Sequence, residues 1–201
     1  GCRGLVIMVS NPVDVLTRVM VEATGLPPQR VIGTGTMLET ARLREMVGRQ
    51  MSIDPRSIHG QVVGEHGDST VPLWSAAHIG GRALREWPGW LPEHEQRLGK
   101  QVREAAYEII RRKGATNHAI GLVTATLIRW ALRGRRVLTV SRVQPTEMGP
   151  ELAGVALSMP AIVSPEGADT VLRPSMDAAE EAALLRSARV LQEAWRSLDR
   201  G

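Results

Sequence analysis

Three residues combine the chemistry of an acid, a cation and a proton carrier: Glu39, Arg42 and His66. Glu39 and Arg42 lie three positions apart in a segment with helical spacing, so their side chains share one helix face. A carboxylate beside a histidine selects one ring tautomer and raises the histidine pKa, which suits acid–base catalysis. An arginine in the same space can bind a substrate carboxylate through two parallel hydrogen bonds. The spacing also fits an ordinary surface ion pair, and that interpretation stays open.

The opening of the chain predicts the elements that precede this group. Residues 5–10 form a short apolar, β-branched run, residues 13–24 have helical spacing, and residues 31–33 form a second apolar run. Gly25 is expected to end the helix. The order strand, helix, strand is one βαβ unit, which is typical of doubly wound α/β sheets. One such unit is too small to make a whole sheet.

The rest of the chain predicts a mixed α+β arrangement. The change of pattern near residue 34 places a domain boundary there, between residues 1–33 and 34–201. The apolar run at 118–132 suits a central buried helix. Helices are expected over residues 36–50, 93–112, 118–132 and 178–198, and strands over residues 57–63, 71–79, 136–143, 154–163 and 170–173.

Composition limits the classes of function. The chain has 201 residues, of which 43% are hydrophobic and 23% charged, as in a globular protein. No run reaches the ~18 apolar residues of a membrane span, so no membrane association is expected. The single cysteine, Cys2, excludes an internal disulfide and fits a reducing cytoplasm. The net charge of +4 comes from scattered arginines with acids between them, so nucleic-acid binding is a distant alternative.

Two further patterns do not predict a cofactor or metal site. Gly33-Thr34-Gly35 resembles the start of a dinucleotide-binding turn, but the position of the third glycine is occupied by Leu38. A metal site formed by His59, His66 and Asp68 is conceivable, but nothing suggests a matching outer shell, and no metal is expected.

Five segments resemble L-lactate dehydrogenases of the lactate/malate dehydrogenase superfamily, and they occur in the family's order over essentially the whole chain. The resemblance implies a fold that is α/β and α+β. Residues 1–33 are then the end of a Rossmann-type NAD-binding domain, and residues 34–201 are the catalytic domain. It also implies that the chain is the C-terminal fragment of a longer dehydrogenase. The segments are VSNPVD (9–14), VIGTGTMLETARLR (31–44), GEHGDS (64–69), KGATNHAIGL (113–122) and GVALSMPAIV (154–163).

The resemblance implies an activity and roles at matching positions. The activity is reversible, NADH-dependent reduction of pyruvate to L-lactate in the complete enzyme. His66 matches the proton donor and acceptor, Arg42 matches the arginine that binds the substrate carboxylate, and Glu39 stands where the acidic partner of the histidine lies. Asn11 and Thr116 match substrate-binding residues.

Further matches concern the cofactor, an effector and assembly. Arg44 and His59 match the pair that binds fructose 1,6-bisphosphate between subunits in allosteric bacterial members. The family forms homotetramers in the cytoplasm, and the same is expected of the complete protein. The matching contacts to NAD are Val9, Ser10, Asn11, Thr34 and Ile120.

The sequence departs from the family in one acid and leaves two alternatives open. The family has aspartate where this chain has Glu39, and a misplacement of ~1 Å can cost about a hundredfold in rate. Because the charge is kept, we expect activity to be reduced rather than abolished. The alternatives are malate dehydrogenase, which shares His66, Arg42 and Asn11, and a non-catalytic fragment that lacks most of the NAD-binding sheet.

Overall fold

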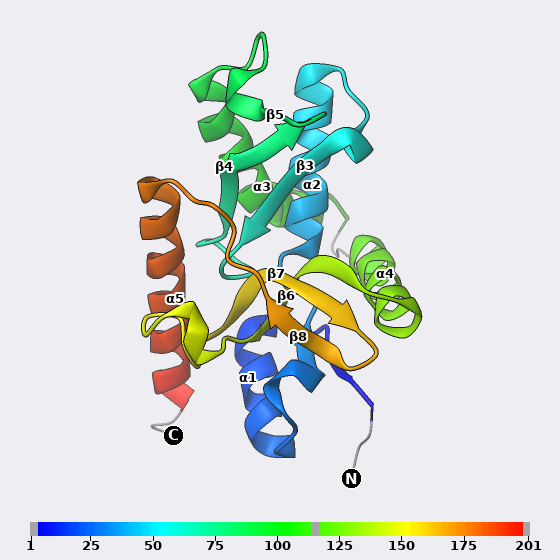
Figure 1. Ribbon diagram of the computed structural model, residues 1–201, viewed down its shortest axis with the longest axis vertical. Coiled ribbons are helices and arrows are strands. Elements are labelled where there is room, and N and C mark those ends of the chain that lie inside the picture. Colours follow the sequence, from blue (N-terminus) through cyan, green and yellow to red (C-terminus); the bar gives the residue numbers. More distant parts are fainter. Residues whose placement is uncertain (1–3, 114–116, 199–201) are drawn as a thin grey trace.

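The computed structural model describes residues 4–113 and 117–198. Two sheets lie one above the other, with helix α5 along one side and helix α4 on the opposite side (Figure 1). The predicted mixture of α/β and α+β elements is confirmed. No helix within the described residues is long and apolar enough to cross a membrane.

The N-terminal βαβ unit forms as predicted. Strand β1 (Val6–Met8) pairs in parallel with β2 (Val31–Gly33), and helix α1 (Val13–Thr24) connects them. Gly25 ends the helix in the left-handed region with φ of 62°, and its N–H donates to the carbonyl of Val21 at 3.0 Å. A residue without a Cβ adopts this conformation at no steric cost, which explains the predicted stop.

The larger sheet joins this unit to the C-terminal strands. Its order is β1-β2-β6-β7-β8, where β6 is Arg136–Val143, β7 is Ala156–Ser164 and β8 is Gly167–Val171. The three C-terminal strands pair antiparallel, as their alternation predicts. Strand β2 pairs with β6 in the same sheet, so the boundary expected at residue 34 falls within a continuous sheet. The domain division stays a prediction.

The smaller sheet contains β3 (Ile58–Val63), β4 (Val71–Ile79) and the short β5 (Arg82–Ala83), all antiparallel. Helices α2 (Met37–Met51) and α3 (Pro92–Lys113) cover it. They bury one apolar cluster, which includes Leu43, Val47, Val62, Leu98 and Val102.

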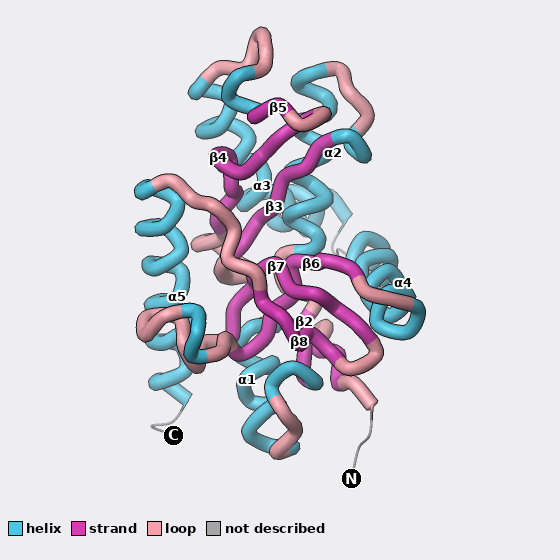
Figure 2. Tube along the Cα trace, viewed as in Figure 1, coloured by secondary structure: helices cyan, strands magenta, loops and turns pink. Residues whose placement is uncertain are grey.

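Helix α5 (Ala178–Leu198) closes the other side of both sheets. Its residues Leu184, Ala188 and Leu191 pack on Leu157 and Met159 of β7. The loop after β8 runs past the junction of the sheets to the start of α5 (Figure 2). Short 3₁₀ helices complete the fold at Pro28–Arg30, Pro55–Ser57, Leu84–Glu86 and Thr146–Met148.

Helix α4 (Asn117–Arg133) corrects one expectation. It lies at the side of the larger sheet and is not central. Over residues 118–133, whose burial the structure describes, only the stripe of Val123, Leu127 and Ala131 is buried. Leu122 and Leu132 are 72% and 71% exposed. The prediction was wrong because apolar composition does not report how many neighbours a helix has. A helix against one sheet covers a single face.

Candidate active site

The structure brings the predicted carboxylate and histidine together. Glu39 lies in the first turn of α2, and His66 lies in the loop between β3 and β4. Nδ1 of His66 is 3.1 Å from Oε2 of Glu39. A buried carboxylate in this position fixes the ring tautomer with the proton on Nδ1 when the ring is neutral. Nε2 is then the ring nitrogen that can exchange a proton with a ligand.

Opposing influences act on the pKa of His66. Burial is the largest of them and lowers the pKa, but the hydrogen bond and charge of Glu39 raise it, and the charge of Asp14 adds to this increase. The net result is a pKa above the ordinary value of 6.5. The imidazolium form therefore persists to higher pH than in a free histidine, which suits a proton donor.

Arg42 completes the group, one helical turn after Glu39. Its Nη1 is 3.5 Å from Oε1 of Glu39, and its side chain is only 12% exposed. Nη2 is buried and has no hydrogen-bond partner among the described residues. Burial lowers the pKa of Arg42, while the charge of Glu39 raises it. A buried donor without a partner is costly, and a bound carboxylate would satisfy it.

Asp14 is a member of the site that sequence reasoning missed. It is buried in the first turn of α1, and its Oδ2 accepts a hydrogen bond from the backbone N–H of His66 at 2.7 Å. Burial raises the pKa of Asp14 to about 6. The available signal was an acid inside the VSNPVD segment, on the helix face shared by the buried Val13 and Thr17.

Hydrogen bonds fix both ends of the loop that carries His66. Before the loop, the backbones of Gly64 and Ser158 exchange two hydrogen bonds of 2.9 Å. Within it, the N–H of Glu65 donates to Oγ of Ser187 at 2.7 Å. On the α3 side, the hydroxyl of Tyr107 donates to Oδ1 of Asp68 at 2.9 Å. These contacts anchor the histidine to the larger sheet and to both long helices.

The residues expected to contact a cofactor lie at the ends of the parallel strands. Val9, Ser10 and Asn11 follow β1 and are exposed, while Thr34 follows β2 and is buried. The N–H of Thr34 donates to the carbonyl of Met8 at 3.0 Å. The carboxyl ends of parallel strands are where open α/β sheets bind ligands. Ile120 is half-buried on α4, and Thr116 lies outside the described residues.

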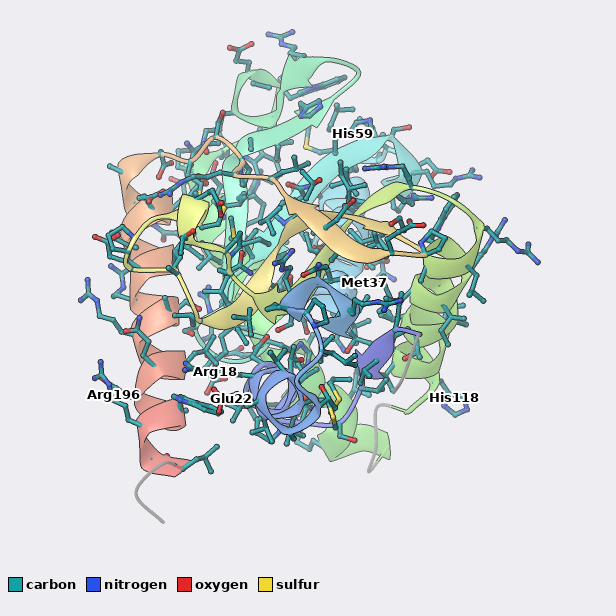
Figure 3. The ribbon with its side chains drawn as sticks, turned by 60° about the horizontal axis from the view of Figure 1, so that its bottom comes forward. Arg18, Glu22, Met37, His59, His118 and Arg196 are labelled. Atoms are coloured by element: carbon teal, nitrogen blue, oxygen red, sulfur yellow. The ribbon has the colours of Figure 1, made fainter. Side chains whose placement is uncertain are left out.

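The predicted effector pair lines a separate pocket of about 520 Å³. Arg44 and His59 share it with Arg56 and Arg136. Nε of Arg44 donates to the carbonyl of Gly60 at 2.9 Å, and burial followed by the charge of Arg136 lowers the Arg44 pKa. In Figure 3, His59 lies on β3, well separated from His118 at the start of α4. The pocket is therefore cationic and suited to an anion.

Residues 4–113 and 117–198 contain no group of three or more His, Cys, Asp or Glu side chains arranged to hold a metal ion. His66 and Asp68 have partners of other kinds, as described above.

Comparison with known proteins agrees with this geometry. The family described as lactate/malate dehydrogenase, alpha/beta C-terminal domain, matches residues 36–198. A protein named L-lactate dehydrogenase from Moorella thermoacetica is 46% identical over 197 residues, covering 95% of this chain and 62% of the relative. A protein of the same name from Synechococcus sp. is 45% identical over 189 residues, covering 93% of this chain and 61% of the relative.

A solved crystal structure of a protein with this name has the same fold. The minor L-lactate dehydrogenase of Enterococcus mundtii has a TM-score of 0.93 and 35% identity, covering 98% of this chain and 64% of that protein. The chain thus spans about three fifths of the length of the proteins it matches. The resemblance stated from the five segments is confirmed, and the chain belongs to the lactate/malate dehydrogenase family.

Proposed function

We propose that the complete subunit reduces pyruvate to L-lactate with NADH in the cytoplasm, and that this chain supplies its proton donor and its substrate-binding arginine. The observation that carries the proposal is the hydrogen bond between His66 and Glu39 beside the unpartnered Nη2 of buried Arg42. The relatives that bear the name L-lactate dehydrogenase support the choice of substrate. We also propose that the chain is one part of that subunit, with its division between residues 33 and 34.

Each step assigned to this chain follows from its own side chains. Arg42 anchors the pyruvate carboxylate and orients the carbonyl group toward His66. His66, as the imidazolium, donates its Nε2 proton to the carbonyl oxygen that becomes the lactate hydroxyl. Glu39 holds Nδ1 and stabilises the positive ring. When bound, NADH supplies the hydride to the carbonyl carbon.

The residues present fit the nicotinamide end of NAD. Val9, Ser10 and Asn11 leave an open surface beyond β1, and Thr34 and Ile120 lie on the neighbouring elements. We assign Asn11 to both substrate and cofactor, and Thr116 to the substrate pocket. The sequence contains no G-x-G-x-x-G turn, so the pyrophosphate would be held by the rest of the subunit.

We further propose that the pocket around Arg44 and His59 binds fructose 1,6-bisphosphate in a homotetramer. Support comes from the positive charge of its lining, where Arg56 and Arg136 join the pair. The variant Arg44→Ala in the complete enzyme should lose activation by this effector while keeping its basal turnover. Equal activation of both proteins would contradict the assignment.

The deciding experiment measures NADH oxidation by the complete subunit with pyruvate and, separately, with oxaloacetate. We expect the kcat/KM for pyruvate to exceed that for oxaloacetate, and His66→Gln to lower the rate on pyruvate about a hundredfold or more. His78→Gln is the control, because this exposed histidine lies on β4, outside the proposed site, and stacks on His59.

Three outcomes would each overturn part of the proposal. Faster turnover of oxaloacetate would make the enzyme a malate dehydrogenase. Full activity of His66→Gln would remove the proposed proton donor. The 201-residue chain alone should bind NADH weakly, and micromolar binding to it would contradict our division of the cofactor site.

A further inference from the structure

One carboxylate at the site serves two partners. Oε2 of Glu39 is 3.1 Å from Nδ1 of His66, and Oε1 is 3.5 Å from Nη1 of Arg42. The glutamate side chain is long enough to reach across from the histidine to the arginine on its own helix. Glu39 is 6% exposed, so solvent screens this pair much less than it screens a surface ion pair.

We propose that Glu39 competes with the substrate carboxylate for Arg42, and so sets the substrate affinity of the site in addition to positioning His66. This inference rests on the proposed function. The positive charge of Arg42 is already partly neutralised by Glu39, and its Nη1 faces Oε1. Nη2 is buried and has no hydrogen-bond partner within the described residues, whereas Nη1 lies in an ion pair 3.5 Å from Oε1. A carboxylate ligand therefore binds an arginine whose Nη1 side is already attracted to Glu39.

The geometry predicts what a shorter acid would do. In Glu39→Asp the side chain loses one methylene, so a carboxylate that keeps the contact with His66 is drawn back from Arg42. The distance between Oε1 and Nη1, already 3.5 Å, then increases, and the attraction that holds Nη1 toward residue 39 weakens. Two parallel charge-assisted bonds bind a carboxylate more strongly than one. The effect belongs to substrate binding, and it is separate from the proton transfer by His66.

The first test compares Glu39→Asp with the unmodified complete subunit. We expect the KM for pyruvate, and the Kd of the unreactive carboxylate ligand oxamate in the presence of NADH, to fall about tenfold, since one added charged hydrogen bond is worth about that much. The control is Glu45→Asp on the same helix, where Glu45 pairs with the exposed Arg49. It should leave both constants unchanged.

A KM-against-kcat split separates competition from a merely structural role. If Glu39 only positions His66, the shorter acid changes kcat and leaves the Kd of oxamate within twofold of the original value. That result, or weaker oxamate binding by a folded Glu39→Asp variant, would overturn the inference.

A second measurement needs no variant and no turnover. In the 201-residue chain, NMR should resolve the Nη1 protons of Arg42 with slow rotation and slow solvent exchange, while those of Arg49 exchange rapidly. Rapid rotation of the Arg42 guanidinium would refute the inference and leave the proposed function intact. If the Arg42 Nη1 protons rotate and exchange slowly but the complete subunit does not turn over pyruvate, the proposed function is refuted. The contact between Glu39 and Arg42 is then still supported.

Discussion

Replacing Asp14 by asparagine should stabilise the protein at neutral pH. Asp14 is buried, and burial raises its pKa from 3.8 to about 6. The folded state thus binds this proton more tightly than the unfolded state does. The stability that protonated Asp14 provides is fully present below pH 3.8 and is lost as pH rises through about 6.

The size of the effect follows from this pKa difference. Because one pKa unit corresponds to about 1.4 kcal/mol, the ionised carboxylate costs ~3 kcal/mol at pH 7. Asparagine has nearly the same shape, and its side-chain oxygen can accept the 2.7 Å hydrogen bond from the N–H of His66. Its amide can donate to Oγ of Ser141, the hydroxyl that lies against Asp14 in the unmodified protein. Asp14→Asn should therefore remove the penalty and keep the contact.

The assay is urea unfolding of the 201-residue chain at several pH values between 4 and 7.5. The stability difference between Asp14→Asn and the unmodified protein should grow from near zero at pH 4 to ~3 kcal/mol at pH 7. Asp54→Asn is the control, because Asp54 is exposed and its hydrogen bonds to Arg56 hold its pKa near 2. A difference that is independent of pH, or a variant less stable at pH 7, would refute the reasoning.

Two other predictions concern packing and the loop of His66. On α4, Leu127→Ala should lower the free energy of unfolding by about 2–5 kcal/mol, because Leu127 is fully buried. Leu132→Ala, at a 71% exposed position, should change it by no more than about 0.5 kcal/mol. Equal losses of stability in urea unfolding would contradict the placement of α4. Tyr107→Phe removes the 2.9 Å hydrogen bond to Asp68 and should speed amide hydrogen exchange in residues 65–69. Exchange in α5 should not change and serves as the internal control. Unaltered exchange in the loop would show that Tyr107 does not anchor it.

Local patterns predicted most of the elements because each had its own signal. Gly25 marked the end of the helix in the βαβ unit, and α1, β2, β4 and α5 formed over the expected residues. The two-residue strand β5 was missed, since two residues carry no periodicity. The side position of α4 was missed because burial depends on neighbours distant in the sequence.

The site was predictable where residues lie close in sequence or match family segments. The Glu39–Arg42 spacing defined a shared helix face, and the resemblance joined His66 to it. Asp14 could not be found by spacing, because it reaches His66 through the backbone from an element 52 positions away. The double contact of Glu39 also depends on side-chain geometry, which residue type alone does not determine.

The central claim is that Glu39 holds His66 as a proton donor, and the pKa of His66 tests it most directly. The histidine ring resonances of the 201-residue chain can be followed by NMR across pH 4 to 9, in the unmodified protein and in Glu39→Gln. We predict that His66 titrates above 6.5, because the hydrogen bond and charge of Glu39 outweigh its burial, and that removing the charge lowers this pKa. A pKa at or below 6.5 that Glu39→Gln leaves unmoved would contradict the account.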